Sequence, residues 1–199
     1  MSGIRSLYRG ATQKGYASAA SAPIRVDDTA NTIKMIPAGT GTTEVEFLPT
    51  VTAPVVVSAT TLTLAPATHG GRTVKLTSAA GCTVALPPAT GSGIKYRIVL
   101  GILQTSGSVI FAVANGNDSF RGFAFVSQDG GAGATLVFAT ANTATLATES
   151  DTVTWNRSTT GTGAIGDSIE VEDFAANVWS IVVKENATGV EATPFSAAV

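Results

Sequence analysis

Short apolar or alternating runs recur about every eight to twelve residues from Val51 onward, and nearly every gap between them contains Gly, Pro, Asn or Asp. No stretch shows the 3.6-residue period of an amphipathic helix. The pattern predicts an all-β fold, a sandwich or barrel of about ten short antiparallel strands. The predicted strands cover residues 55–64, 72–76, 82–86, 95–101, 108–114, 120–126, 134–140, 151–155, 168–172 and 178–185.

In the last of these runs, "VWSIVVKE", one face of the strand is fully apolar and the other is nearly so. Trp179 and Val183 fall on one face, and Val178 and Val182 share the other. Such a strand is covered on both sides, by a second sheet and by a neighbouring subunit. The large apolar side chains predicted to form the core are Phe111, Phe123, Phe125, Phe138, Trp155 and Trp179.

Residues 1–50 differ from this pattern and are predicted to form an extended N-terminal arm, with a β domain over residues 51–199. The arm has scattered apolar residues without a sustained period. It has short strand signals only around Thr32–Ile36 and Glu44–Leu48. Alone, such a segment buries too little apolar area to offset its ordering entropy, so the arm is expected to lie on a partner.

Charged residues make up only 13% of the chain, about half the usual share. So few charges favour self-association, which predicts burial in an oligomer or larger assembly. Residues 1–97 hold nine basic and four acidic residues, whereas residues 98–199 hold three basic and ten acidic residues. The basic start lacks the dense Lys/Arg and interleaved aromatics of a nucleic-acid interface, so no nucleic-acid partner is expected.

The stretch "GTGAIG", Gly161 to Gly166, fits the glycine fingerprint of a dinucleotide-binding loop. That loop functions only where a buried strand leads into it and a helix follows it. Downstream, Ile169 and Val171 alternate with polar residues, which indicates a strand. The glycines are therefore predicted to form a turn between two strands, and no cofactor is expected.

Candidate catalytic residues are few, and the chain is expected not to be an enzyme. His69 is the only histidine, and "ATHGGR" predicts a solvent-exposed turn histidine. Cys82 is the only cysteine and is predicted to be a small buried residue. One His and one Cys exclude the usual zinc sites, and a single cysteine excludes an internal disulfide.

The acidic cluster "DSIEVED" leaves more than one reading open. Glu170 and Glu172 share a strand face, which favours a solvated edge. A Ca²⁺ site built from Asp167, Glu170, Glu172 or Asp173 is an alternative. A carbohydrate-active enzyme would require Glu170 and Glu172 to act across a cleft. The solvated edge is preferred, so no metal site is expected.

Targeting signals are not expected in this sequence. The N-terminus lacks the apolar core of a secretory signal, and no window has eighteen uninterrupted apolar residues, so no membrane association is predicted. Glycosylation requires secretion, so the N-x-S/T matches at Asn117, Asn156 and Asn186 are not expected to be glycosylated.

At the level of whole segments, the chain resembles small virion proteins of tailed bacteriophages, the capsid decoration (cement) and head-fibre type. The resemblance rests on "LTLAPATHGGRTVKLTSAAGCTVALPPATGSGIKYRIVLG", on "SVIFAVANGNDSFRGFAFV", on "SDTVTWNRSTTGTGAIGDSIEVEDFAANVWSIVV" and on the closing "GVEATPFSAAV". It covers roughly Thr61 to Val199, and the N-terminal arm matches least.

The resemblance implies a non-enzymatic structural protein that stabilises the capsid shell. Its expected partners are its own copies, as a homotrimer, and the major capsid protein. Its expected location is the capsid surface of the virion after synthesis in the host cytoplasm. The runner-up is a tail-fibre or receptor-binding β domain that recognises a host-surface saccharide, around exposed aromatics in "NGNDSFRGF". The residues predicted to contact the shell are Arg5, Tyr8, Arg9, Lys14, Tyr16 and Arg25.

Overall fold

The computed structural model describes residues 53–128, 135–143, 145, 148–188 and 191–199, together with three strands near the N-terminus. The chain divides into two compact units, Met1–Ala53 and Pro54–Val199. The first unit contains a three-stranded antiparallel sheet of β1 (Ile24–Asp27), β2 (Thr32–Met35) and β3 (Val45–Phe47). Strands β2 and β3 fall within the two ranges predicted from the sequence, whereas β1 was not predicted.

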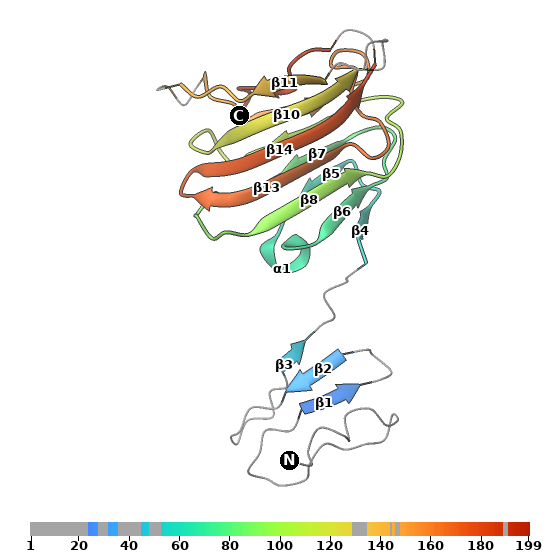
Figure 1. Cartoon of the computed structure of the whole chain (residues 1–199), viewed down its shortest axis with the longest axis vertical. Helices are drawn as coiled ribbons and strands as arrows, with labels where there is room; N and C mark the ends of the chain where they lie inside the picture. Colours follow the sequence, from blue (N-terminus) through green and yellow to red (C-terminus); the bar gives the residue numbers. More distant parts are fainter. Residues whose placement is uncertain are drawn as a thin grey trace. The chain divides into compact units, whose positions relative to one another are not determined.

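The second unit is a sandwich of two sheets, so the predicted all-β class is confirmed (Figure 1). The seven-stranded sheet has the order β11 (Thr135–Ala139), β10 (Ser119–Gln128), β14 (Val178–Ala187), β13 (Ser168–Ala175), β8 (Lys95–Leu100), β6 (Thr73–Leu76) and β4 (Val55–Val57). The five-stranded sheet has the order β15 (Phe195–Ser196), β12 (Thr152–Trp155), β9 (Val109–Ala112), β7 (Cys82–Ala85) and β5 (Thr61–Thr63).

Every strand predicted from Val55 onward is present, with two differences in detail. The run 55–64 breaks into β4 and β5, which belong to different sheets, and β15 was not predicted. The only described helix, α1 (Pro66–His69), is a single turn with proline at its start. No helix in the described residues is long and apolar enough to cross a membrane.

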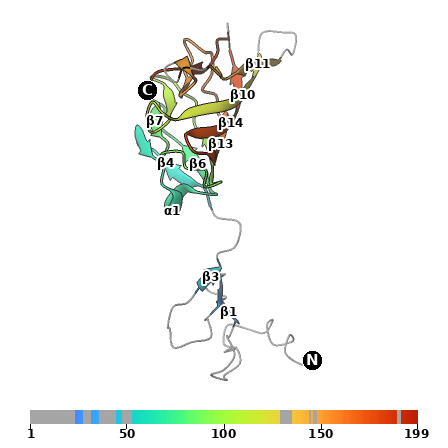
Figure 2. The ribbon, with the colours of Figure 1, turned by 90° about the vertical axis from the view of Figure 1, so that its left-hand side faces the viewer.

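The prediction that the strands are antiparallel is wrong for half of the sandwich. Successive strands from β4 to β9 alternate between the two sheets, and each strand from β4 to β7 pairs in parallel with the strand two places further on. Val55, Val74 and Ile98 therefore align side by side. A parallel pair needs a crossover connection, and here the other sheet supplies it in place of a helix. Figure 2 shows this unit turned by 90°.

The two sheets pack around large aromatic side chains that were predicted to be core residues. Trp155 and Trp179 are fully buried. The Phe111 and Trp155 rings lie 5.9 Å apart in an edge-to-face arrangement, and the Tyr96 and Trp179 rings lie 6.0 Å apart. Each sheet thus contributes one aromatic pair to the core. Phe138 packs partly buried against it.

Phe123 and Phe125 were also predicted to be core residues, and this prediction is wrong. They lie on the outward side of β10 and are 50% and 42% exposed, whereas Ala124 and Val126 point into the core. Both faces of β10 carry apolar side chains. The alternation along the strand therefore shows which residues share a face, but it does not identify the face that is buried.

We expect Trp179→Ala to lower the free energy of unfolding by about 3–5 kcal/mol, because it removes a large buried side chain and leaves a cavity. Phe123→Ala should lower it by no more than about 1 kcal/mol, because the ring is half exposed. Urea denaturation of both variants measures the difference. Equal losses would place Phe123 in the core and contradict the fold.

Candidate functional site

The glycine motif forms a turn between β12 and β13, as predicted. Gly161, Gly163 and Gly166 have φ values of 70°, 101° and 96°, in the left-handed region that favours glycine. Strand β13 begins at Ser168, so no helix follows the motif to present amides to a phosphate. The turn therefore lacks the setting that a dinucleotide-binding loop requires.

Asp167 holds this turn in place. Its Oδ2 accepts hydrogen bonds from the backbone N–H groups of Gly163 and Ala164, both at 2.8 Å, and its Oδ1 accepts one from Asn186 at 2.9 Å. Asp167 is 1% exposed. Burial raises the pKa of its carboxyl, and these three hydrogen bonds act in the opposite direction. The side chain fixes the turn against the end of β14.

The acidic cluster is split between the two faces of the sheet. On the outer face, Glu170 Oε1 lies 3.5 Å from Arg97 and 3.4 Å from Lys184, and Glu172 Oε2 lies 3.1 Å from Lys95. Asp173 points inward. No three or more His, Cys, Asp or Glu side chains gather to hold a metal within the described residues. Glu170 and Glu172, the two residues of the solvated-edge prediction, thus take part in surface ion pairs.

Asp173 binds the loop that precedes β8. Its Oδ1 accepts hydrogen bonds from the N–H groups of Thr90 and Gly91, and its Oδ2 accepts from the N–H of Ser92 and from the hydroxyls of Thr90 and Ser92. The five distances lie between 2.7 and 3.0 Å. Burial alone would raise the pKa of this carboxyl, but the five hydrogen bonds outweigh it and lower the pKa well below its ordinary value.

Glu185 lies near Asp167 at the end of β14. Unlike that of Asp173, its carboxyl group is buried without hydrogen bonds from the described part of the chain that would stabilise its charge. Glu185 is 4% exposed, and neither carboxyl oxygen has a hydrogen-bond partner among the described residues. Burial, together with the negative charge of Asp167, raises its pKa to about 8, although the nearby Trp155 indole acts in the opposite direction. Glu185 is therefore largely protonated at neutral pH.

His69 was predicted to be an exposed turn residue, and this prediction is wrong. It is 8% exposed at the end of α1, where its Nδ1 accepts a hydrogen bond of 2.9 Å from the N–H of Ala65. The side chain thus satisfies a backbone donor at the start of the helix. Cys82 is 2% exposed, as predicted, and burial raises the pKa of its thiol.

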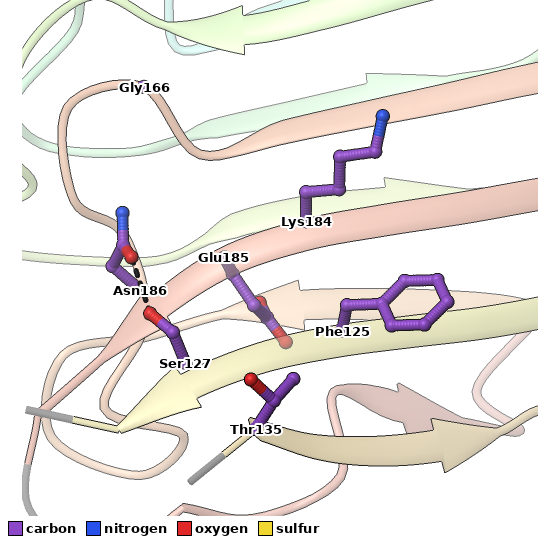
Figure 3. A pocket seen from close by; sticks show the side chains of 7 residues that line it. All are labelled: Phe125, Ser127, Thr135, Gly166, Lys184, Glu185 and Asn186. Carbon is purple, nitrogen blue, oxygen red and sulfur yellow. Dashed lines mark hydrogen bonds between the residues drawn. The ribbon is translucent and has the colours of Figure 1, made fainter. Parts of the chain in front are cut away.

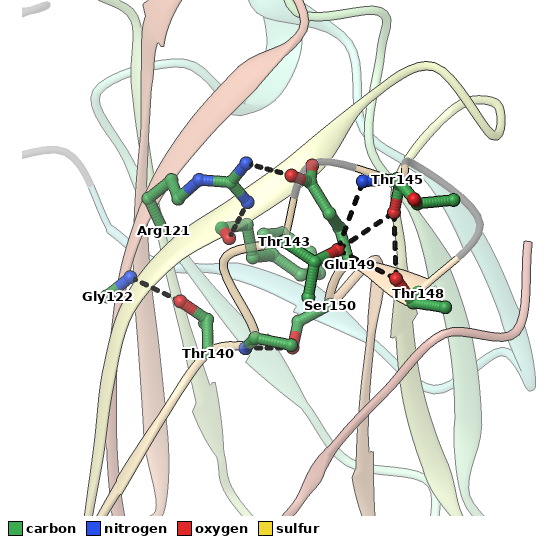
Figure 4. Close-up of polar contacts among 10 residues, drawn as sticks. Arg121, Gly122, Thr140, Thr143, Thr145, Thr148, Glu149 and Ser150 are labelled. Carbon is green, nitrogen blue, oxygen red and sulfur yellow. Dashed lines mark hydrogen bonds and ion pairs between the residues drawn. The ribbon is translucent and has the colours of Figure 1, made fainter.

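A second polar network fixes the connection between β11 and β12 to β10 (Figure 4). Arg121 Nη2 lies 2.6 Å from Glu149 Oε1, and that hydrogen bond outweighs burial and lowers the pKa of the Glu149 carboxyl. The N–H of Gly122 donates to the Thr140 hydroxyl at 3.1 Å, and the N–H of Ala141 donates to Ser150 at 2.9 Å. Phe120, in the stretch predicted to expose aromatics, is fully buried, whereas Phe123 is exposed.

The outer face of the seven-stranded sheet has two halves. Over β13 and β8 it carries the ion pairs of Glu170 and Glu172. Over β10 and β11 it exposes Phe123, Phe125 and Val137, with exposed fractions between 42% and 56%. Exposed apolar side chains that gather on one face mark an interaction surface.

The outer face of the seven-stranded sheet also has a shallow pocket of about 250 Å³ at one end of its strands (Figure 3). The pocket lies at the ends of β10 and β14 and the start of β11, next to the glycine turn. Sequence reasoning did not identify it, because its residues are distant in the chain and carry no motif. Its lining residues are Phe125, Ser127, Thr135, Gly166, Lys184, Glu185 and Asn186.

The residues predicted to contact a shell all belong to the first of the two units. Arg5, Tyr8, Arg9, Lys14 and Tyr16 lie outside the described residues. Arg25 lies in β1, where it is paired with Lys34 of β2 in the antiparallel register.

Comparison with known proteins leaves the chain without an assigned family. No protein-family model, no curated protein and no solved structure matches it.

We expect Asp173→Asn to lower the free energy of unfolding at pH 7 by about 3 kcal/mol, because an amide cannot accept all five hydrogen bonds. The lowered pKa stabilises the fold above the unfolded value of 3.8, and this contribution is lost as the pH falls below it. The difference between wild type and variant should therefore shrink on acidification below about pH 4. Thermal denaturation from pH 2 to 7 measures it, with Glu172→Gln as the neighbouring surface control. A difference independent of pH would contradict this role.

Glu185→Gln should have the opposite pH dependence. A pKa raised from 4.5 to about 8 stabilises the fold below pH 4.5, and this contribution is lost as the pH rises toward 8. The variant does not titrate, so its stability relative to wild type should increase by more than about 1 kcal/mol between pH 5 and pH 8. Chemical denaturation at both pH values tests this. A constant difference would mean that Glu185 ionises normally.

Proposed function

We propose that this chain is a non-enzymatic structural protein of a tailed-phage virion, which binds and stabilises the capsid shell as a decoration or head-fibre protein. We propose further that it assembles as a homotrimer and that its partner is the major capsid protein. The mechanism is binding: a protein that bridges neighbouring shell subunits adds buried area that resists the pressure of packaged DNA.

The division of the chain into two units carries this proposal. The larger unit is a sandwich with its own core, and the described part of the smaller unit is a three-stranded sheet of short strands. A protein that attaches to a shell needs one part for attachment and one part for bulk. The small unit fits the first role, because residues 1–26 carry four basic residues and no acidic one, and Arg5, Arg9 and Arg25 can pair with carboxylates of the shell.

The surface of the sandwich supports an assembly role as well. Six of its described acidic residues are buried, namely Asp118, Glu149, Asp151, Asp167, Asp173 and Glu185. On the outer sheet face, Glu170 and Glu172 are offset by lysine and arginine. Seven basic and three acidic residues of the described sandwich are then left exposed or half-buried, and this basic excess suits contact with an acidic protein surface.

The runner-up proposal is a tail-fibre or receptor-binding domain. The exposed Phe123 and Phe125 favour it, because a receptor-binding domain also needs exposed apolar side chains. The two proposals differ in where the protein lies on the virion.

Immunogold labelling of the source virions with an antibody against the sandwich tests this difference. We expect many gold particles over the head. Labelling confined to the tail would overturn the decoration proposal and favour the receptor-binding one.

If the N-terminal arm attaches the protein to the shell, then reversing the charge of its arginines should weaken shell binding. Arg5→Glu with Arg9→Glu in the full chain should weaken binding to shells that lack the protein at least tenfold, because two paired arginines become repelled carboxylates. Lys75→Glu with Lys95→Glu, on the sandwich, is the matched charge-reversal control and should bind normally. Co-sedimentation with the shells measures both. Equal losses would mean that net charge, and not the arm, controls binding.

A further inference from the structure

The pocket on the outer face of the seven-stranded sheet has one aromatic side and one polar side (Figure 3). Phe125 of β10 forms the aromatic side, and its ring is 42% exposed. Ser127 and Asn186, which are neighbours across β10 and β14, form the polar side together with Thr135 of β11. Lys184 is the neighbour of Phe125 across the same strand pair.

The polar side is arranged before any ligand arrives. The Ser127 hydroxyl donates a hydrogen bond of 2.5 Å to Asn186 Oδ1, which fixes the plane of the amide. The amide nitrogen of Asn186 then has no hydrogen-bond partner among the described residues and remains a free donor. The Asn186 backbone N–H is held in turn by Asp167. The side chain is therefore anchored at both ends.

The strands beneath the pocket provide a rigid base. Strands β10 and β14 pair in parallel along their full lengths, from Ser119 with Val178 to Gln128 with Ala187. Side chains on such a base lose little further freedom when a ligand binds, which favours affinity.

The chemistry of this lining fits a sugar. A pyranose ring has an apolar C–H face and a rim of hydroxyl groups that both donate and accept hydrogen bonds. An exposed aromatic ring complements the apolar face, and amide and hydroxyl groups complement the rim. We propose that this pocket binds one pyranose ring of a saccharide, with Phe125 under the ring and with Ser127, Thr135 and Asn186 on its hydroxyls.

The size and charge of the pocket agree with this ligand. A volume of about 250 Å³ is below the range of drug-sized sites and suits a single ring. Lys184 is the only basic residue in the lining, so the pocket lacks the cluster of positive charges that a nucleic acid or polyphosphate requires. The Lys184 ammonium lies 3.4 Å from Glu170, a weak exposed pair that leaves it available to a ligand hydroxyl.

This inference goes beyond the proposed function and does not depend on it, since a sugar site on the sandwich is compatible with attachment through the arm. Failure of shell binding would leave sugar binding intact, and the reverse also holds. Because the pocket is shallow, we expect a dissociation constant in the roughly millimolar range for a monosaccharide. Several copies in one oligomer would strengthen binding to a surface that displays many glycans.

The test uses the purified full-length chain on an array of immobilised mono- and oligosaccharides, at a density that permits multivalent binding. The methyl glycoside of the sugar that is retained is then titrated by NMR chemical-shift mapping. We expect Phe125→Ala to weaken binding at least tenfold and Asn186→Ala to weaken it several-fold. Phe123→Ala is the matched control, because it lies on the same strand and face, is similarly exposed and does not line the pocket.

Three results would overturn the proposal. The first is that the wild-type chain binds no sugar on the array. The second is that Phe123→Ala weakens binding as much as Phe125→Ala, and the third is that the shifted resonances lie away from the pocket. Light scattering of the same variants identifies the competing occupant. If the wild type binds no sugar and both phenylalanine variants dissociate an oligomer, then this face is a contact between copies of the chain. Unchanged thermal denaturation of the variants shows that the fold is intact.

Discussion

Buried carboxylates that accept backbone N–H groups hold the connections between the two sheets. Because successive strands alternate between sheets, the chain repeatedly crosses the ends of the sandwich, where no ladder satisfies the backbone donors. Asp173 accepts three such donors and two hydroxyls from the loop before β8, and Asp167 accepts three donors around the glycine turn. Asp151 accepts the N–H groups of Ala198 and Val199. Asp173 and Asp167 thus hold crossings between the sheets, and Asp151 holds the chain after β15.

The same arrangement determines the character of the surface. Acidic side chains that bind loops inside the sandwich are removed from the outside, which leaves few exposed acids. On the outer sheet face, Glu170 and Glu172 are offset by lysine and arginine across the strands. A surface with exposed phenylalanines is suited to contacts with other molecules.

The pocket on the outer face is formed by residues from separate parts of the chain. Phe125 and Ser127 come from β10, Lys184 and Asn186 come from β14, and the two strands lie side by side only because β14 enters the sheet between β13 and β10. The Asp167 carboxylate that closes the glycine turn also holds the backbone of Asn186. The pocket is therefore rigid at the same point where the turn is closed.

The sequence by itself determined the all-β class, the position of every strand from β6 to β14, the turn at Gly161 to Gly166, and Trp155 and Trp179 as core. These follow from local patterns of alternation and turn residues. Only the tertiary structure decided that β4 to β9 pair in parallel, because a turn signal marks the end of a strand without saying which sheet the next one joins. It also placed Phe123 and Phe125 outside, since both faces of β10 are apolar and packing alone selects the inner one. It decided finally that Asp173 binds a loop about eighty residues earlier in the chain. That contact joins residues far apart in sequence, and no local pattern encodes it.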